Sequence, residues 1–189
     1  MSIVMVVGSP GAGKTAITNA AAKRGVRIIQ IGTLMEEEAT RKGYIKDRDQ
    51  IRHSLGLRLQ RELQAHAFGS LSKMKGNVVV DTHMSIWSND RYIVGVPHDS
   101  LESLKNVVAW VYIDAATGDI TKRRRLDKSR NRDMVSPHDI EMQRMLNLSL
   151  FFHCAWYTGA PLYIIYNKEG KLKESIRQFD RILSETIGV

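Results

Sequence analysis

The sequence predicts an α/β fold in which a five-stranded parallel sheet is covered by helices on both faces. Short apolar runs alternate with longer stretches of helical pattern along the 189 residues. Glycines, capping residues and prolines separate the two kinds of segment. Strands that alternate with helices pair in parallel and bind ligands above their carboxyl ends. The length fits one domain over residues 1–189, large enough to bury a core around a central sheet.

The expected strands are the apolar runs at 3–7, 26–31, 77–81, 107–114 and 161–166. An Ala-rich helix is expected over 14–24, because Gly25 follows it as a stop signal. Thr33 and Glu36 have the spacing of a capping box, which predicts the start of a helix that ends near residue 42.

A second capping pattern, Asp47 with Gln50, predicts a helical stretch that breaks or kinks near Gly56 and continues towards residue 75. Helices are expected to fill the remaining gaps between strands. The segment 120–125 has the pattern of a helix end and passes into a polar, basic loop over 126–135.

A long helix is expected after this loop. Ser136 is suited to the cap, Pro137 to the first position and Asp139 to the first turn. Its second half, 145–156, is apolar on more than one side, which indicates a core helix or a subunit interface. A last helix is expected over 171–187.

The first turn after the first strand carries a phosphate-binding motif, G-x-x-x-x-G-K-[ST], formed by Gly8, Ser9, Pro10, Gly11, Ala12, Gly13, Lys14 and Thr15. Its glycines let successive backbone N–H groups turn inward around a phosphate, at the positive end of the following helix. Lys14 would reach the β- and γ-phosphates, and Thr15 would offer its hydroxyl to Mg²⁺. A glycine-rich turn without a ligand is the alternative. The strand, loop and Lys-Thr order favours a P-loop NTPase fold that binds a nucleoside triphosphate.

Two further features point to phosphoryl transfer. Asp81 ends a strand beside the loop, where its carboxylate could hold Mg²⁺ directly or through water, the alternative being a turn aspartate. Between residues 122 and 132 the chain has seven basic residues against one acidic residue, Asp127. Arg130 and Arg132 lie in a loop between helices and could fold as a short basic lid over a phosphate chain. A solvated cluster of charge is the alternative for this segment.

Composition narrows the class of partner. The formal net charge is +8, but much of it lies in this one segment, which suits a polyphosphate clamp better than a long nucleic-acid footprint. The single cysteine, Cys154, stands among apolar residues and is expected to be a core thiol. The six histidines lack the spacing of a zinc site. Without a leader pattern or a membrane-spanning run, the expected location is the cytoplasm.

The chain resembles nucleoside monophosphate kinases, most closely the archaeal-type adenylate kinase family. The resemblance covers nearly the whole chain and rests on the phosphate loop and five further pieces: Ile31-Gly32-Thr33, Asp47-Arg48-Asp49-Gln50-Ile51-Arg52, Val80-Asp81-Thr82-His83, Ser129-Arg130-Asn131-Arg132-Asp133 and Asn167-Lys168-Glu169-Gly170.

The resemblance implies reversible, Mg²⁺-dependent transfer of the γ-phosphoryl group of ATP to AMP. It implies a helical acceptor-binding part over 33–75, where Thr33 lies at the acceptor base and Arg52 at its phosphate. Thr82 and His83 would line the acceptor side, and Asn167 would lie in the loop at the donor nucleotide.

In the same family Arg123, Arg130 and Arg132 would correspond to arginines that contact both phosphate chains. The variable stretch that follows leaves open which of Arg123, Arg124 and Arg125 contacts phosphate. Relatives of this type are commonly trimers, so a homo-oligomer is also implied.

Catalysis of this kind needs no nucleophilic side chain, because the acceptor's own phosphate oxygen attacks. It needs two anions held in line and their repulsion neutralised by Lys14, Mg²⁺ and arginines. Two alternatives stay open. One is a related kinase for another nucleoside monophosphate or for a small molecule such as dephospho-coenzyme A. The other is an NTP-dependent assembly or nucleic-acid factor, which the net basic charge keeps in view.

Overall fold

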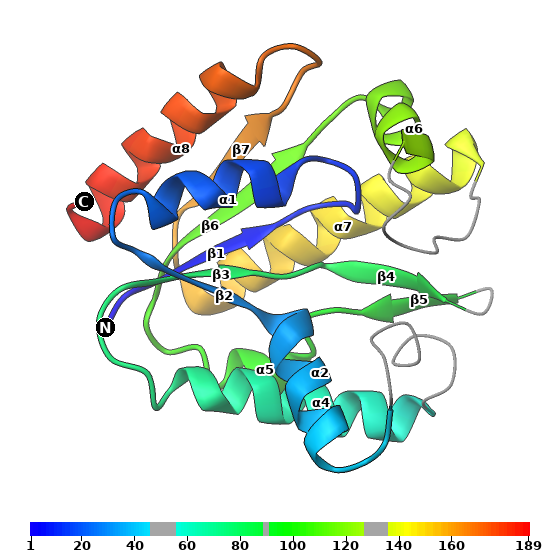
Figure 1. Cartoon of the computed structure of the whole chain (residues 1–189), viewed down its shortest axis with the longest axis vertical. Coiled ribbons are helices and arrows are strands. Elements are labelled where there is room, and N and C mark those ends of the chain that lie inside the picture. The colour runs from blue at the N-terminus through cyan, green and yellow to red at the C-terminus, as the bar shows by residue number, and fades with distance from the viewer. Residues whose placement is uncertain (46–55, 89–90, 127–135) are drawn as a thin grey trace.

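In the computed structural model, which describes residues 1–45, 56–88, 91–126 and 136–189, a five-stranded parallel sheet runs through the molecule (Figure 1). Its strands are β1 (Ile3–Val7), β2 (Arg27–Gln30), β3 (Val78–Asp81), β6 (Val107–Asp114) and β7 (Leu162–Tyr166). Their order is β2-β3-β1-β6-β7. The predicted parallel sheet is therefore confirmed. Because β1 lies in the centre, its carboxyl end, from which the phosphate loop emerges, faces the ends of β3 and β6.

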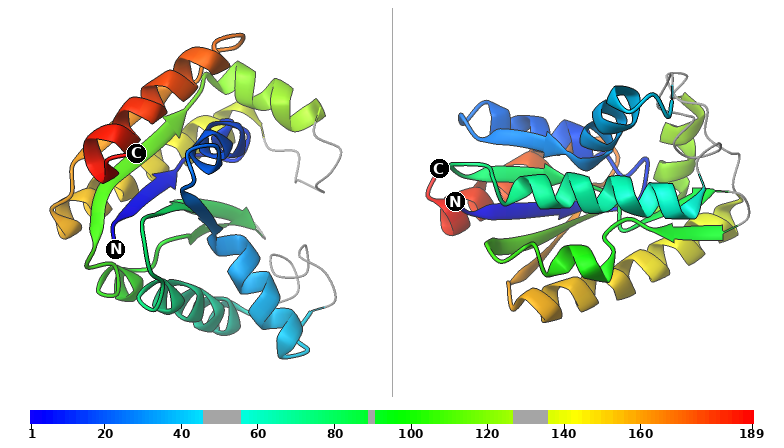
Figure 2. Two further views of the ribbon diagram at one scale, coloured as in Figure 1. Left: turned by 60° about the vertical axis from the view of Figure 1, so that its left-hand side comes forward. Right: turned by 90° about the horizontal axis from the view of Figure 1, so that it is seen from below.

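Helices cover both faces of this sheet, as expected. On one face lie α1 (Lys14–Ala22), α6 (Thr117–Leu126) and α8 (Leu172–Ile187), and on the other α2 (Ile31–Arg41), α4 (Leu57–Leu71), α5 (His98–Leu101) and α7 (Pro137–Thr158). In Figure 2, right, α1 lies above the sheet and α7 below it. The side chains of β1 alternate between two cores: Met5 packs with Phe151 of α7, and Val6 packs with Phe179 of α8. The central strand is thus buried on both faces, which fixes the loop that follows it.

The second strand and the helix after it differ from the prediction. The strand ends at Gln30, and α2 begins at Ile31, two residues before Thr33. Thr33 does not cap the helix; its hydroxyl donates to Oε1 of Gln30 at 3.3 Å. The capping-box assignment at Thr33 was wrong because burial of Ile31 and Met35, one turn apart in the core, sets where the helix begins. The second capping pattern, Asp47 with Gln50, lies outside the described residues. The α4 helix begins after Gly56 and ends at Leu71, a few residues earlier than expected.

The stretch between β3 and β6 also differs, because a helix was expected to fill it. It contains instead an antiparallel pair, β4 (Ser85–Ser88) and β5 (Arg91–Val94), followed by the short helix α5. Trp87 and Tyr92 face each other across the pair with ring centroids 4.7 Å apart. Aromatic and β-branched cross-strand pairs stabilise such ribbons. These local preferences therefore prevailed over the strand–helix alternation seen in the rest of the chain.

The long helix α7 begins as the sequence predicts. The Ser136 hydroxyl accepts from the N–H of Asp139 at 3.1 Å, and the Asp139 carboxylate accepts from the N–H of Ser136 at 3.0 Å. Cys154 on this helix is buried, as expected, and burial raises the pKa of its thiol to about 12. None of the helices in the described ranges has the length and apolar character needed to cross a bilayer.

Candidate active site

The phosphate loop connects β1 to α1 and takes its shape from glycine. Gly8, Gly11 and Gly13 have φ angles of 148°, 90° and 97°. A Cβ atom on Gly8 would overlap the carbonyl oxygen of Ile113, and one on Gly13 would overlap the side-chain amide of Asn167. Side chains other than hydrogen are therefore excluded at both positions by conformation and by space. The result is a tight loop whose backbone lies close to its neighbours.

Lys14 begins α1, and its side chain is held at the mouth of the loop. Only 6% of the residue is exposed. Its ammonium donates to the carbonyl oxygen of Gly8 at 3.1 Å and lies 3.0 Å from Nδ1 of His83. Nδ1 of His83 also lies 3.3 Å from the carbonyl oxygen of Gly8, so the lysine, the histidine and the backbone of the loop meet at one point. His83, predicted to line the acceptor side, thus also contacts the principal cation of the loop.

A cavity of about 330 Å³ opens beside Lys14 and brings most of the predicted site residues together. It is lined from the phosphate loop, from the end of β3, from α2 and α4, and from the hairpin: Pro10, Gly11, Gly13, Lys14, Thr15, Ala16, Gln30, Ile31, Gly32, Met35, Gln64, Asp81, Thr82, His83, Ile86, Gly95 and Arg123. Thr33 is not among them, although its partner Gln30 is. Arg52 lies outside the described residues.

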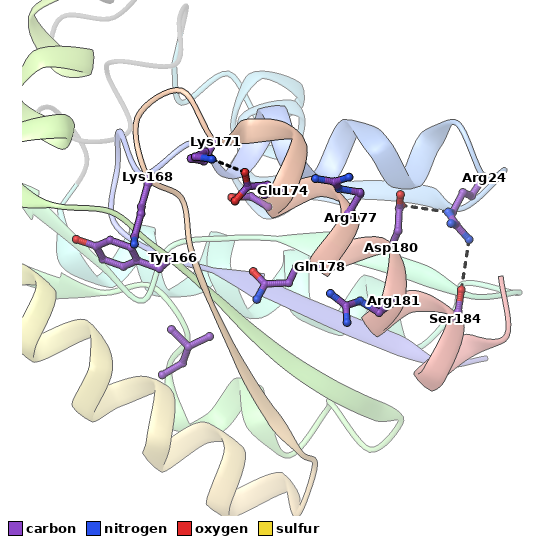
Figure 3. A pocket seen from close by; sticks show the side chains of 12 residues that line it. Arg24, Tyr166, Lys168, Lys171, Glu174, Arg177, Gln178, Asp180, Arg181 and Ser184 are labelled. Atoms are coloured by element: carbon purple, nitrogen blue, oxygen red, sulfur yellow. Dashed lines mark hydrogen bonds and ion pairs between the residues drawn. The ribbon is translucent and has the colours of Figure 1, made fainter.

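A larger open groove, about 990 Å³, runs along α8 and the end of β7 (Figure 3). Two ion pairs lie on the α8 side of the groove. Lys171 contacts Glu174 at 2.6 Å, and Arg24 contacts Asp180 at 3.1 Å. This groove contains neither the glycine loop nor Lys14. We therefore place the candidate active site at the smaller cavity, where a cationic side chain and a glycine-rich backbone meet.

Two aspartates end the strands that flank β1 at this edge of the sheet, and they have different surroundings. Asp114, at the end of β6, is bound by the guanidinium of Arg144 through two contacts of 2.9 and 2.6 Å. These hydrogen bonds raise the pKa of Arg144 above its already high ordinary value. Asp81, at the end of β3 opposite Val6, lines the cavity instead. Of the two carboxylates, Asp81 is thus the one that shares a cavity with the exposed Thr15.

The three arginines near the end of α6 differ in their contacts. Arg123 lines the cavity and donates to the carbonyl oxygens of Ala12 at 3.3 Å and Asn167 at 3.2 Å. Arg124 donates to the carbonyl oxygen of Pro10 at 2.8 Å and so braces the loop from behind. Arg125 is exposed and does not line the cavity. Arg130 and Arg132 lie outside the described residues.

Asn167 follows β7 and is 4% exposed. Its side-chain amide donates to the carbonyl oxygen of Ala12 at 2.8 Å, and its oxygen accepts from the Ser175 hydroxyl at 3.3 Å. The predicted donor-side residue therefore contacts the backbone of the phosphate loop.

Sequence reasoning missed several residues of this site. Gln30 and Gln64 were not singled out, although both contribute amide groups to the cavity wall. Ile86 on β4 and Gly95, directly after β5, were missed because the antiparallel pair β4–β5 was not predicted. Gln64 could have been found from its place in the helical pattern. It lies on the apolar face of α4, where a buried polar residue needs a hydrogen-bond partner or a ligand.

Comparison with known proteins gives three kinds of match. Residues 7–141 match the family described as AAA domain. The chain is 35% identical over 187 residues to the adenylate kinase of Pyrococcus furiosus, covering 96% of this chain and 94% of that protein. It is 33% identical to the adenylate kinase of Methanocaldococcus jannaschii, covering 96% of this chain and 97% of that protein. Among solved structures, shikimate kinase from Acinetobacter baumannii in complex with shikimate superposes with a TM-score of 0.68 at 18% identity, covering 99% and 96% of the two chains. The last match supports the fold alone.

Proposed function

The chain belongs to the adenylate kinase family and contains the AAA domain, and we propose that it transfers the γ-phosphoryl group of ATP to AMP at the cavity beside Lys14. The observation that carries this proposal is the convergence of the glycine loop, Lys14 and Asp81 on one cavity, in a chain similar to adenylate kinases over nearly its full length. The transfer is reversible and gives two molecules of ADP.

On the donor side, we propose that residues 8–15 bind the phosphates of ATP and that Asn167 supports this loop from behind. Asn167 fits this role because its amide donates to the carbonyl oxygen of Ala12 and so holds the backbone of the loop in place. Lys14 would leave Gly8 and His83 to contact the transferred phosphoryl group.

Thr15 and Asp81 would hold Mg²⁺ together with the nucleotide. Their hydroxyl and carboxylate oxygens line one cavity and are the hard donors that Mg²⁺ prefers. Once bound, Mg²⁺ neutralises charge that develops on the phosphate oxygens.

On the acceptor side, we propose that residues 33–75 bind AMP. Thr82 and His83 would form part of its wall, Arg52 would contact its phosphate, and Thr33 would act at the base. For Thr33 the support is indirect, through its hydrogen bond to the cavity residue Gln30.

The segment 126–135 would close as a lid and bring Arg130 and Arg132 to the two phosphate chains, beside Arg123. Closure would exclude water, which would otherwise accept the phosphoryl group and waste ATP.

The test is to supply the purified protein with ADP and Mg²⁺ alone. Two adjoining sites that hold ATP and AMP must also accept two ADP molecules and run the transfer backwards, so ATP and AMP should form in equal amounts. A molecule that joins two adenosines through five phosphates should inhibit strongly, because it occupies both sites with one loss of translational freedom.

A kinase with a non-nucleotide acceptor, or an NTP-dependent assembly factor, makes no ATP from ADP. Release of inorganic phosphate without formation of ATP would therefore contradict the proposal. A screen of AMP, CMP, GMP, UMP and dephospho-coenzyme A as acceptors would then identify the alternative.

We also propose that the chain forms a homo-oligomer through the outer face of α7. Met145, Phe152 and Trp156 are exposed on this face, Trp156 to 80%, and their spacings of seven and four residues place them along one side of the helix. Wild-type protein should be larger than its 21.4 kDa chain by light scattering, and Phe152→Glu should reduce it towards a monomer. An unchanged mass in the variant would exclude this face.

A further inference from the structure

A closed ring of hydrogen bonds lies behind the wall of the active-site cavity, on the side of α7. Two amide side chains of α7, Gln143 and Asn147, stand one turn apart and are 3% and 0% exposed. The sequence pattern marked only the second half of this helix, 145–156, as apolar, and it did not single out Gln143 or Asn147. Buried amides are costly unless each donor and acceptor is used.

Asn147 joins the phosphate loop to the hairpin. Its amide nitrogen donates to the Ser9 hydroxyl at 3.0 Å, and its oxygen accepts from the Ser85 hydroxyl at 2.6 Å. Ser9 and Ser85 are both fully buried. The loop and strand β4 are therefore connected through a single side chain that reaches neither solvent nor the cavity.

Gln143 closes the ring on the other side. Its nitrogen donates to the backbone oxygen of Ser85 at 3.2 Å, and its oxygen accepts from the Arg124 guanidinium at 3.1 Å. Arg124 in turn donates to the carbonyl oxygen of Pro10, the residue after Ser9. The ring therefore runs from the loop through α6, α7 and β4 and returns to the loop (Figure 1 labels these three elements).

The three segments that α7 joins, namely the loop, α6 and β4, each carry a cavity residue at or next to the ring member. Pro10 itself lines the cavity, Arg123 precedes Arg124, and Ile86 follows Ser85. The wall of the donor loop, the basic helix and the hairpin wall are thus fixed relative to one another by α7. A buried polar network of this kind specifies one geometry, whereas apolar packing would tolerate several.

We propose that Asn147 and Gln143 are positioning residues for phosphoryl transfer, which set the donor loop, Arg123 and the hairpin in the register that in-line transfer requires. In-line transfer loses rate steeply when reacting groups are misplaced by about 1 Å. This inference rests on the proposed function, since its readout is ATP formation from ADP. It adds residues that touch no substrate and act only through Ser9, Ser85 and Arg124.

The test compares Asn147→Ala with Thr158→Val on the same helix. Thr158 accepts a hydrogen bond from Nε1 of Trp110 at 2.9 Å, far from the cavity, so its replacement removes a side-chain hydrogen bond without touching the ring. Asn147→Ala should lower kcat by about tenfold or more with small changes in KM, because a misplaced transition state is the expected defect. Thr158→Val should leave kcat within about twofold at a similar loss in Tm.

Ser85→Ala removes one hydroxyl from the ring and serves where Asn147→Ala does not fold. It should lower kcat in the same direction. The double variant should be no worse than Asn147→Ala alone, because the Ser85 hydroxyl acts through Asn147. Equal small effects of Asn147→Ala and Thr158→Val, or additive effects in the double variant, would overturn the proposal. An inactive wild type would instead contradict the proposed function.

Discussion

The two sides of the active-site cavity are built in different ways. The donor side comes from one continuous segment, residues 8–15, whose shape depends on backbone angles at Gly8, Gly11 and Gly13. The acceptor side is assembled from side chains on α2, α4, the end of β3 and the hairpin. A site made by local backbone conformation is encoded locally. A site made by tertiary packing depends on segments that the sequence does not place next to one another.

Because the donor side is a separate segment, substitutions in residues 8–15 should lower turnover with any acceptor. The largest effect is expected for Lys14→Ala, which removes a cation from the position where charge is redistributed in the transition state. Turnover should fall about 10³-fold or more with little change in Tm. The matched control is Lys23→Ala, an exposed lysine just beyond the other end of α1. Near-normal turnover in Lys14→Ala would show that the phosphate loop takes no part in phosphoryl transfer, and the distinction between the two sides of the cavity would not hold.

The two aspartates at the sheet edge provide the second prediction. Asp81→Asn should shift the Mg²⁺ titration to higher concentration and lower turnover by about 10²-fold, because it weakens a ligand oxygen at the phosphates.

Asp114→Asn is the matched control, since it breaks the pair between Asp114, at the end of β6, and Arg144 of α7. It should cost on the order of 3 kcal/mol in unfolding free energy, somewhat less if solvent screens the partly exposed Arg144, with an unaltered Mg²⁺ titration. If both variants titrate Mg²⁺ like the wild type, Asp81 is a turn residue.

These residues also show how far sequence reasoning reached. The parallel sheet, the phosphate loop, the cap of α7 at Ser136 and the buried Cys154 were predicted correctly, because each depends on a local pattern. The place of Gly8 and Lys14 at the junction of β1 and α1 could be predicted before any contact was known, since strand, loop and helix follow one another directly.

The features that could not be predicted from the sequence depend on packing between distant segments. The start of α2 was displaced from Thr33 to Ile31 because the core, and not the cap, determines it. The hairpin β4–β5 was missed because the general alternation of strands and helices was extended to a stretch with β-forming side chains. Gln64 could not be assigned to the site for the same reason, since its partner is the carbonyl of Val94 in that hairpin.

Gln64 gives the third prediction, which sharpens the distinction between the two sides. Its amide donates to Val94 at 3.0 Å and lines the cavity from α4. Gln64→Ala should raise the KM for AMP about five- to tenfold, as expected for loss of one to two neutral hydrogen bonds, and leave the KM for ATP within about twofold. Gln60→Ala is the matched control, because Gln60 is similarly buried one turn earlier but does not line this cavity. Equal changes in both KM values would mean that the two sides are not separable.

The smallest effect is expected from Glu38 on α2, which supports the acceptor side without facing the cavity. Its carboxylate is 5% exposed and accepts two hydrogen bonds of 2.8 Å from Arg41, with Lys42 at 3.2 Å. The hydrogen bonds from Arg41 are the main reason that the pKa of Glu38 falls from 4.5 to about 2.

A pKa lowered in the folded state means that the stabilisation is fully present above pH 4.5 and is lost as the pH falls towards about 2. Glu38→Gln should therefore lower Tm by a few degrees at pH 7, and this difference should shrink below pH 4.5 until the two proteins melt alike. Glu37→Gln, an exposed neighbour on the same helix, should melt like the wild type throughout. A difference in Tm that stays constant down to pH 3 would show that packing of the side chain, and not its charge, supports α2. Because α2 carries acceptor-side residues and no part of the phosphate loop, ATP binding should be equal in all three proteins at pH 7.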